Sequence, residues 1–191
     1  FWREGQPRMD SVNRLILELE TRPDRDELRA APEAVDLAVL KRLADDPLVI
    51  DRAKGKKQVE RLWAACGLPD FQKLGAEHHA RTVSRIWRFL SEGQGHIPRD
   101  WFAQQLARLD SVQGDIDTLS SRIAAARTWS YIAHRADWLA HPAEMAERTR
   151  AVEERLSDAL HAALTQRFVD RRTTVLLRDM GQDASNLPVD V

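Results

Sequence analysis

The chain has 191 residues, of which 43% are hydrophobic and 31% are charged, a composition that excludes a disordered segment and favours a folded globular domain. A single cysteine, Cys66, excludes a disulfide framework and favours a reducing compartment, so we expect a cytoplasmic protein. No apolar run approaches the roughly 18 residues that span a bilayer, and we expect no membrane partner. The first residue is Phe1 rather than methionine, so we expect a fragment of a longer protein.

The net charge of −1 conceals an uneven distribution of charge along the chain. Residues 52–108 carry 11 Lys and Arg against 5 Asp and Glu, a net charge of +6. Residues 1–51 carry a net charge of −4, and residues 109–191 carry −3. A basic centre between acidic flanks predicts a local anionic partner for the centre of the chain.

Apolar residues recur at the spacing of helix faces along most of the chain, and the alternating runs typical of β-strands are nearly absent. In chain order, these stripes are Val12, Leu15, Ile16 and Leu19; Val35, Val39 and Leu43; Val59, Leu62, Trp63 and Cys66; Val83, Trp87 and Leu90; Phe102, Leu106 and Leu109; Ile116, Leu119 and Ile123; and Met145, Val152, Leu156 and Leu160. The pattern predicts an all-α fold of about seven or eight helices, arranged as a bundle-like domain.

Proline and glycine residues set the expected boundaries. Seven of the eight prolines lie at or near the start of a helix-like segment, where the missing backbone N–H costs nothing. We expect one helical domain over residues 1–180, with a sub-boundary at the loop "GQGHIP", residues 93–98. Residues 181–191 are expected to form an irregular tail that leads to a further C-terminal segment.

The segment "RTWSYIAHRADW", residues 127–138, is rich in aromatic residues. A helix over residues 115–140 would be apolar on two sides, which is typical of a central helix with neighbours all round. We therefore predict that Trp129 and Trp138 belong to the core. His134 is interpreted as an interior hydrogen-bonded histidine rather than a catalyst, and Arg127 as a buried arginine paired with an acidic residue of a neighbouring helix.

Signatures of catalysis are missing from the sequence. It contains no phosphate-binding loop, no dinucleotide fingerprint, no nucleophile elbow and no zinc-protease motif. In "EHH", residues 77–79, the adjacent histidines would point about 100° apart on a helix, so they do not converge on a metal. We expect this chain to hold no catalytic residue, metal or cofactor, and Cys66 to be an inert apolar residue.

Basic residues form the best candidate for a binding surface. Arg81, Arg85 and Arg88, with His78 beside them, share one face of an expected helix whose other face is apolar. Lys54, Lys56, Lys57 and Arg61 form a second basic group just before it. Counter-charges four residues away are scarce, and the arginine fork suits phosphate, so this pattern favours contact with a nucleic-acid backbone. An ordinary solvated helix face remains the alternative.

Two further features complete the candidate surface. Trp101, in "PRDWFAQQL", is predicted to be exposed and able to stack on a base. Four arginines near the C-terminal end are interleaved with Asp170 and Asp179, and we interpret them as ordinary surface; they are Arg167, Arg171, Arg172 and Arg178.

Four long segments resemble a known family. They are "DELRAAPEAVDLAVLKRLADDP", "CGLPDFQKLGAEHHARTVSRIWRFL", "GDIDTLSSRIAAARTWSYIAHRADWL" and "RAVEERLSDALHAALTQRFVDRRTTVL". In order, they resemble the helical region that follows the helicase core in alphaproteobacterial relatives of the mitochondrial degradosome RNA helicase, a DExH-type family of superfamily two. The resemblance covers about residues 9–190 and contains no catalytic motif.

The resemblance implies an accessory domain of an ATP-dependent helicase that acts on RNA or DNA. Two RecA-like motor domains of the parent chain would bind ATP and Mg²⁺, and the helical region would pack on them. The implied partners are single-stranded RNA or DNA, these motor domains and an exoribonuclease. The alternative is a helical protein–protein interaction module that binds no nucleic acid.

Overall fold

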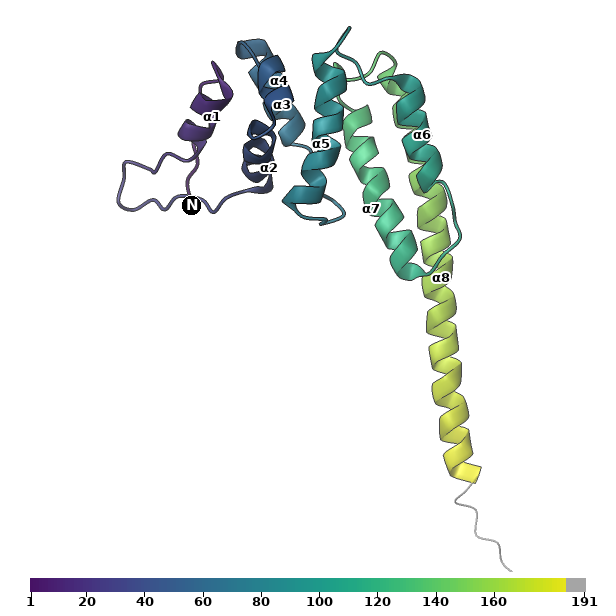
Figure 1. Cartoon of the computed structure of the whole chain (residues 1–191). Coiled ribbons are helices and arrows are strands. Elements are labelled where there is room, and N and C mark those ends of the chain that lie inside the picture. Colours follow the sequence, from purple (N-terminus) through teal and green to yellow (C-terminus); the bar gives the residue numbers. More distant parts are fainter. Residues whose placement is uncertain (185–191) are drawn as a thin grey trace, which may run out of the picture.

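The computed structural model describes residues 1–184, apart from the side chains of residues 179 and 181–184, and within that range it is all-α with eight helices. The helices are α1 (Val12–Leu19), α2 (Val35–Ala44), α3 (Pro47–Arg52), α4 (Lys56–Cys66), α5 (Ala76–Ser91), α6 (Arg99–Leu109), α7 (Ile116–Ala133) and α8 (Pro142–Ala184). The all-α prediction is therefore confirmed. Helices α1 to α7 form a head, and α8 runs along α6 and α7 and then extends well beyond them (Figure 1).

Local sequence explains where several helices begin. The side chains of Ser11 and Asp115 accept hydrogen bonds from the backbone N–H groups three residues ahead, at the starts of α1 and α7. Asp46 caps α3 in a similar way, and Pro47 takes the first helical position. These caps satisfy backbone donors that lack partners within the helix.

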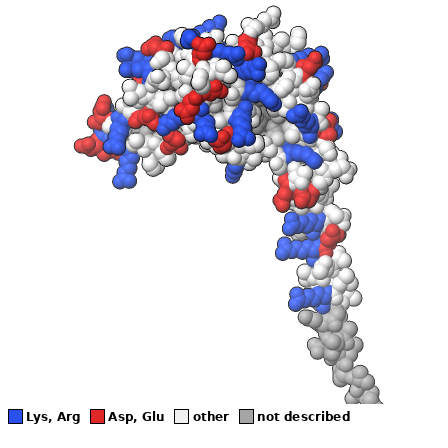
Figure 2. Space-filling model, in the orientation of Figure 1, with Lys and Arg blue, Asp and Glu red and all other residues white. Residues whose placement is uncertain are grey.

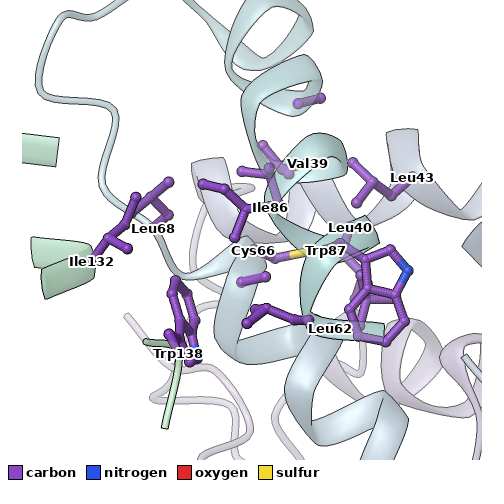
Figure 3. Packing of buried hydrophobic residues seen from close by; sticks show 14 of the residues in the cluster. Val39, Leu40, Leu43, Leu62, Cys66, Leu68, Ile86, Trp87, Ile132 and Trp138 are labelled. Carbon is purple, nitrogen blue, oxygen red and sulfur yellow. The ribbon is translucent and has the colours of Figure 1, made fainter. Parts of the chain in front are cut away.

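A large hydrophobic cluster joins α1 to α7 with the start of α8. Its largest fully buried side chains include Trp87, Trp138 and Phe102. In Figure 3, Trp87 lies beside Leu40 and Leu62, and Trp138 lies near the same group although it comes from a distant part of the chain. This main core contains residues on both sides of the loop at 93–98. A smaller cluster joins α7 to the first half of α8.

The aromatic segment at 127–138 lies in the core, as predicted, but it is not a single helix. Trp129 and Trp138 are 8% and 1% exposed. Helix α7 ends at Ala133, so the expected helix over 115–140 is too long, and Trp138 reaches the core from the following loop. The interior position expected for His134 is wrong, because His134 is an exposed C-cap residue whose Nδ1 lies 2.7 Å from the Ser130 carbonyl oxygen.

Arg127 also lies outside the core. Its side chain is 58% exposed rather than buried, and its Nε lies 3.5 Å from a carboxylate oxygen of Glu153 on α8. The neighbouring acidic partner was expected, whereas the burial was not. Because exposed pairs of this kind contribute little, Arg127 is a marginal contact between α7 and α8.

Helix α8 differs between its two halves. Met145, Val152 and Leu156 are buried against the head, whereas large apolar residues from Leu164 onwards are exposed. Residues 181–184, expected to start an irregular tail, continue the helix, and the rest of that tail lies outside the described residues. Nowhere in residues 1–184 is there a helix both long and apolar enough to cross a membrane.

Candidate nucleic-acid interface

Helix α5 has the two faces that its sequence predicted. Val83, Trp87 and Leu90 are buried on one side of the helix. Arg81 and Arg88 lie on the other side with 73% and 70% of their side chains exposed, and Arg85 is exposed between them. The spacing of the three arginines along one face gives an exposed row of guanidinium groups.

Carboxylates accompany this arginine row, contrary to the expectation that counter-charges are scarce. Glu77 lies 3.8 Å from Arg81, four residues along α5, and also pairs with Arg42 of α2. Glu92 lies 3.5 Å from Arg88. Within residues 1–184, Arg85 takes part in no ion pair. Figure 2 shows the same mixture of basic and acidic side chains over the head. The positive charge is therefore partly balanced, and Arg85, at the middle of the row, is the arginine of the row without an ion pair among the described residues.

The arginine row borders a groove of about 540 Å³ between α5, α3 and the end of α2. Arg42 and Arg52 face the row from α2 and α3, so five arginines line one groove. Glu92 joins two sides of it, because it contacts Arg52 at 2.6 Å as well as Arg88. Sequence reasoning missed Arg42 and Arg52, since only the packing of α2 and α3 on α5 brings them there. Arg42 belongs to the segment 1–51, whose net charge is −4, and Arg52 is the first residue of the basic segment 52–108, far from the α5 arginines in the sequence.

The three predicted lysines lie apart from this groove. Lys54 pairs with Asp51, and Lys56 lies 3.9 Å from Glu60. Lys57 is exposed at the start of α4 and forms no ion pair within the described part of the chain. None of the three lines the groove. They therefore form an exposed basic group of their own rather than an extension of the α5 row.

Arg61 is a structural residue rather than a free ligand of phosphate. Its guanidinium donates hydrogen bonds to the carbonyl oxygens of Leu90 at 2.9 Å, Gly95 at 2.9 Å and Asp137 at 3.1 Å. The expectation that Arg61 belongs to the basic surface is wrong in this respect, because three hydrogen bonds to backbone carbonyl oxygens already hold its guanidinium in place. These contacts exist because tertiary packing brings α4 close to two distant loops, and no pattern in the local sequence predicts them.

Trp101 is half-buried, whereas we expected it to be exposed. Its ring centroid lies 4.9 Å from that of Phe89 and 5.4 Å from that of Trp129. Edge-on and tilted contacts of this kind stabilise a core in addition to the area they bury. Trp101 is thus part of an aromatic cluster, and its limited exposure does not support the prediction that it stacks on a base.

The histidine pair and the cysteine have structural surroundings. His79 is buried, and its Nε2 donates a hydrogen bond of 2.7 Å to the Leu68 carbonyl oxygen, whereas His78 is exposed. No group of three or more potential metal ligands comes together among the residues that the structure describes. Burial raises the pKa of the Cys66 thiol well above its usual range, so this thiol stays protonated.

Basic side chains also follow the free half of α8. Arg167, Arg171 and Arg172 are exposed and form no ion pair with other described residues. Figure 2 shows Lys and Arg side chains projecting from one edge of this extension, on the side that the head overhangs. They remain interpreted as ordinary surface.

Comparison of the chain with protein-family models, with curated proteins and with solved structures finds no match.

Proposed function

We propose that this chain is an accessory helical domain of an ATP-dependent helicase and contacts single-stranded RNA or DNA through backbone phosphates. In this proposal, RecA-like motor domains of the parent chain bind ATP and Mg²⁺, and the helical domain packs on them in the cytoplasm. An exoribonuclease is the further partner that the family resemblance suggests. The four segments quoted above support the assignment to the helicase, and the α5 arginine row supports the contact with nucleic acid.

The observation that carries the proposal is the exposed row of Arg81, Arg85 and Arg88 beside two further arginines from α2 and α3. Guanidinium groups donate paired hydrogen bonds to phosphate oxygens, and they stay charged at every physiological pH. The glutamates of the row pair at exposed positions, where an ion pair contributes little free energy. A phosphate can therefore replace a carboxylate at small cost.

Fluorescence anisotropy with labelled single strands of RNA and DNA, over a series of salt concentrations, tests the proposal. We expect the variant R81A/R85A/R88A to bind more weakly and to lose about 0.7 from the slope of log affinity against log salt for each phosphate contact removed. Sequence preference should be weak, because phosphates carry no base information. The same substitutions in the longer parent chain provide a second context for the measurement.

A matched control removes the same charge elsewhere. Arg127, Arg148 and Arg150 also lie at the surface, and each contacts a glutamate. The variant R127A/R148A/R150A should keep nearly the wild-type affinity and salt slope, and circular dichroism should show that both variants fold. If the α5 variant binds as the wild type does, in the fragment and in the parent chain, the arginine row is not the interface.

A second candidate function, a protein–protein interaction module, is favoured by the free half of α8. Its large apolar side chains are 47% to 68% exposed: Leu164, Phe168, Val169, Val175, Leu176, Leu177 and Met180. Large exposed apolar side chains gathered on one segment are typical of an interaction site. This candidate replaces the first if the wild-type chain binds no single strand at low salt.

A further inference from the structure

The floor of the arginine-lined groove is apolar. Leu43, Val49, Ala80 and Trp87 contribute to its lining, and each of these side chains belongs to the main core. A volume of about 540 Å³ lies in the range of sites that enclose one small ligand group. The groove therefore combines an apolar base with a cationic rim, an arrangement that a solvated helix face does not need.

Trp87 adds a specific hydrogen-bond donor to this floor. Its side chain is 1% exposed, and its Nε1–H has no hydrogen-bond partner among the described residues. Figure 3 shows the indole nitrogen on the side of the ring turned away from Leu62. A buried donor without an acceptor is unusual in a folded protein. Gln58 Oε1 and Arg135 Nε also lack a partner among the described residues, but of these three residues only Trp87 lines the groove, so its N–H is the donor that a ligand in the groove could satisfy.

The rim suits a phosphodiester strand. Arg81 and Arg85 are one turn apart, about 6 Å along the helix axis, which is comparable with the step between successive phosphates of an extended strand. Arg85 has no carboxylate partner within residues 1–184, and the partnered arginines of the rim are exposed. The indole N–H of Trp87 is itself buried, so side chains around the groove must move for an acceptor to reach it.

We propose that the groove takes one unpaired nucleobase of a bound single strand. The base lies on the apolar floor and accepts a hydrogen bond from Trp87 Nε1–H, while the flanking phosphates contact Arg85 and its neighbours. This proposal rests on the proposed function above and specifies how that surface binds its strand. A base is favoured over an acidic protein segment because a base offers both an apolar face for the floor and an acceptor for the buried indole N–H, whereas a row of carboxylates would use only the rim.

The test compares two strands of about 12 nucleotides, one normal and one abasic, by fluorescence anisotropy. Both strands carry the same phosphates, so only the bases differ. The wild type should bind the normal strand about tenfold more tightly than the abasic strand. Ser84 lines the groove and is half-buried, so S84F should place a bulky ring in the groove without changing the charge and should reduce this difference. S157F, the same substitution at an exposed position of α8 outside the groove, should behave as the wild type.

A second variant, W87F, keeps an aromatic ring but removes the indole N–H. It should weaken binding of the normal strand and leave binding of the abasic strand unchanged, and thermal melting should show that it folds. If W87F does not fold, the comparison of S84F with S157F still decides the question.

The outcomes separate the two proposals. Equal binding of both strands by the wild type, with no effect of S84F, overturns base insertion and leaves phosphate contact standing. Binding of neither strand overturns both proposals. Displacement of the normal strand by a polyglutamate peptide as effectively as by an unlabelled strand shows an acidic protein ligand and also overturns base insertion.

Discussion

Replacement of Arg61 by alanine should destabilise the fold without changing how the chain binds anions. The guanidinium connects α4 to the end of α5, to the loop after it and to the loop after α7, through the carbonyl oxygens of Leu90, Gly95 and Asp137. Close approach at Gly95 shows how tightly the group fits, because an added Cβ there would lie 2.2 Å from Arg61 Nη1. In R61A, all three carbonyl oxygens would lose a charged donor.

The magnitude follows from these three hydrogen bonds. The bonds to Leu90 and Gly95 are partly buried, and each should contribute about 1.5 kcal/mol, the low end for a charged donor. The bond to Asp137 is exposed and adds little. The free energy of unfolding should fall by about 3 kcal/mol in total, which lowers the melting temperature by about 6–12 °C in a chain of this size.

Differential scanning calorimetry and urea unfolding give the measurement, and anisotropy gives the affinity for a single strand. R61K should recover only part of the loss, because an ammonium group cannot span three separated carbonyl oxygens. R127A serves as a surface control and should change the stability by less than about 1 kcal/mol. A melting temperature within 2 °C of the wild type, together with a loss of strand affinity, would refute the structural role and return Arg61 to the binding surface.

Two further predictions concern the core. W129A should lower the free energy of unfolding by about 3–5 kcal/mol, because Trp129 is 8% exposed and its ring packs edge-on against Trp101 and Phe102. Urea unfolding measures this loss, with F168A on the exposed part of α8 as the control, and an unchanged midpoint would contradict the core assignment. Cys66 should resist a thiol reagent at pH 8 in the folded chain, because the thiol is buried and burial raises its pKa, and it should react once the chain is unfolded in urea. Rapid labelling of the folded chain would show that the thiol is accessible and would contradict its burial.

The predicted helices follow from local information. Helical spacing of apolar residues indicated the fold class, and the caps at Ser11, Asp46 and Asp115 agree with the side chains that favour helix starts. Burial of Trp129 and Trp138 was also predictable, because large aromatic residues within an apolar pattern are usually internal. The end of α7 at Ala133 was not predictable, since no proline or glycine marks it.

The candidate site was predictable from the sequence only in part. The three arginines of α5 share a face because of their spacing alone, so the sequence was sufficient to group them. Sequence reasoning underestimated how many of these arginines pair with a glutamate. Glu77 and Glu92 lie at the two ends of the same helix, and their contacts with Arg42 and Arg52 depend on neighbouring helices.

By itself, the sequence determined periodicity: which residues share a helix face, and which of those faces is apolar. Such patterns depend only on the geometry of the backbone over a few turns. Only the tertiary structure decided that Arg61 is engaged by three carbonyl oxygens, that Trp101 packs beside Trp129, and that the groove joins α2, α3 and α5. These contacts join residues far apart in the chain, and their partners depend on how the helices pack, which no local pattern specifies.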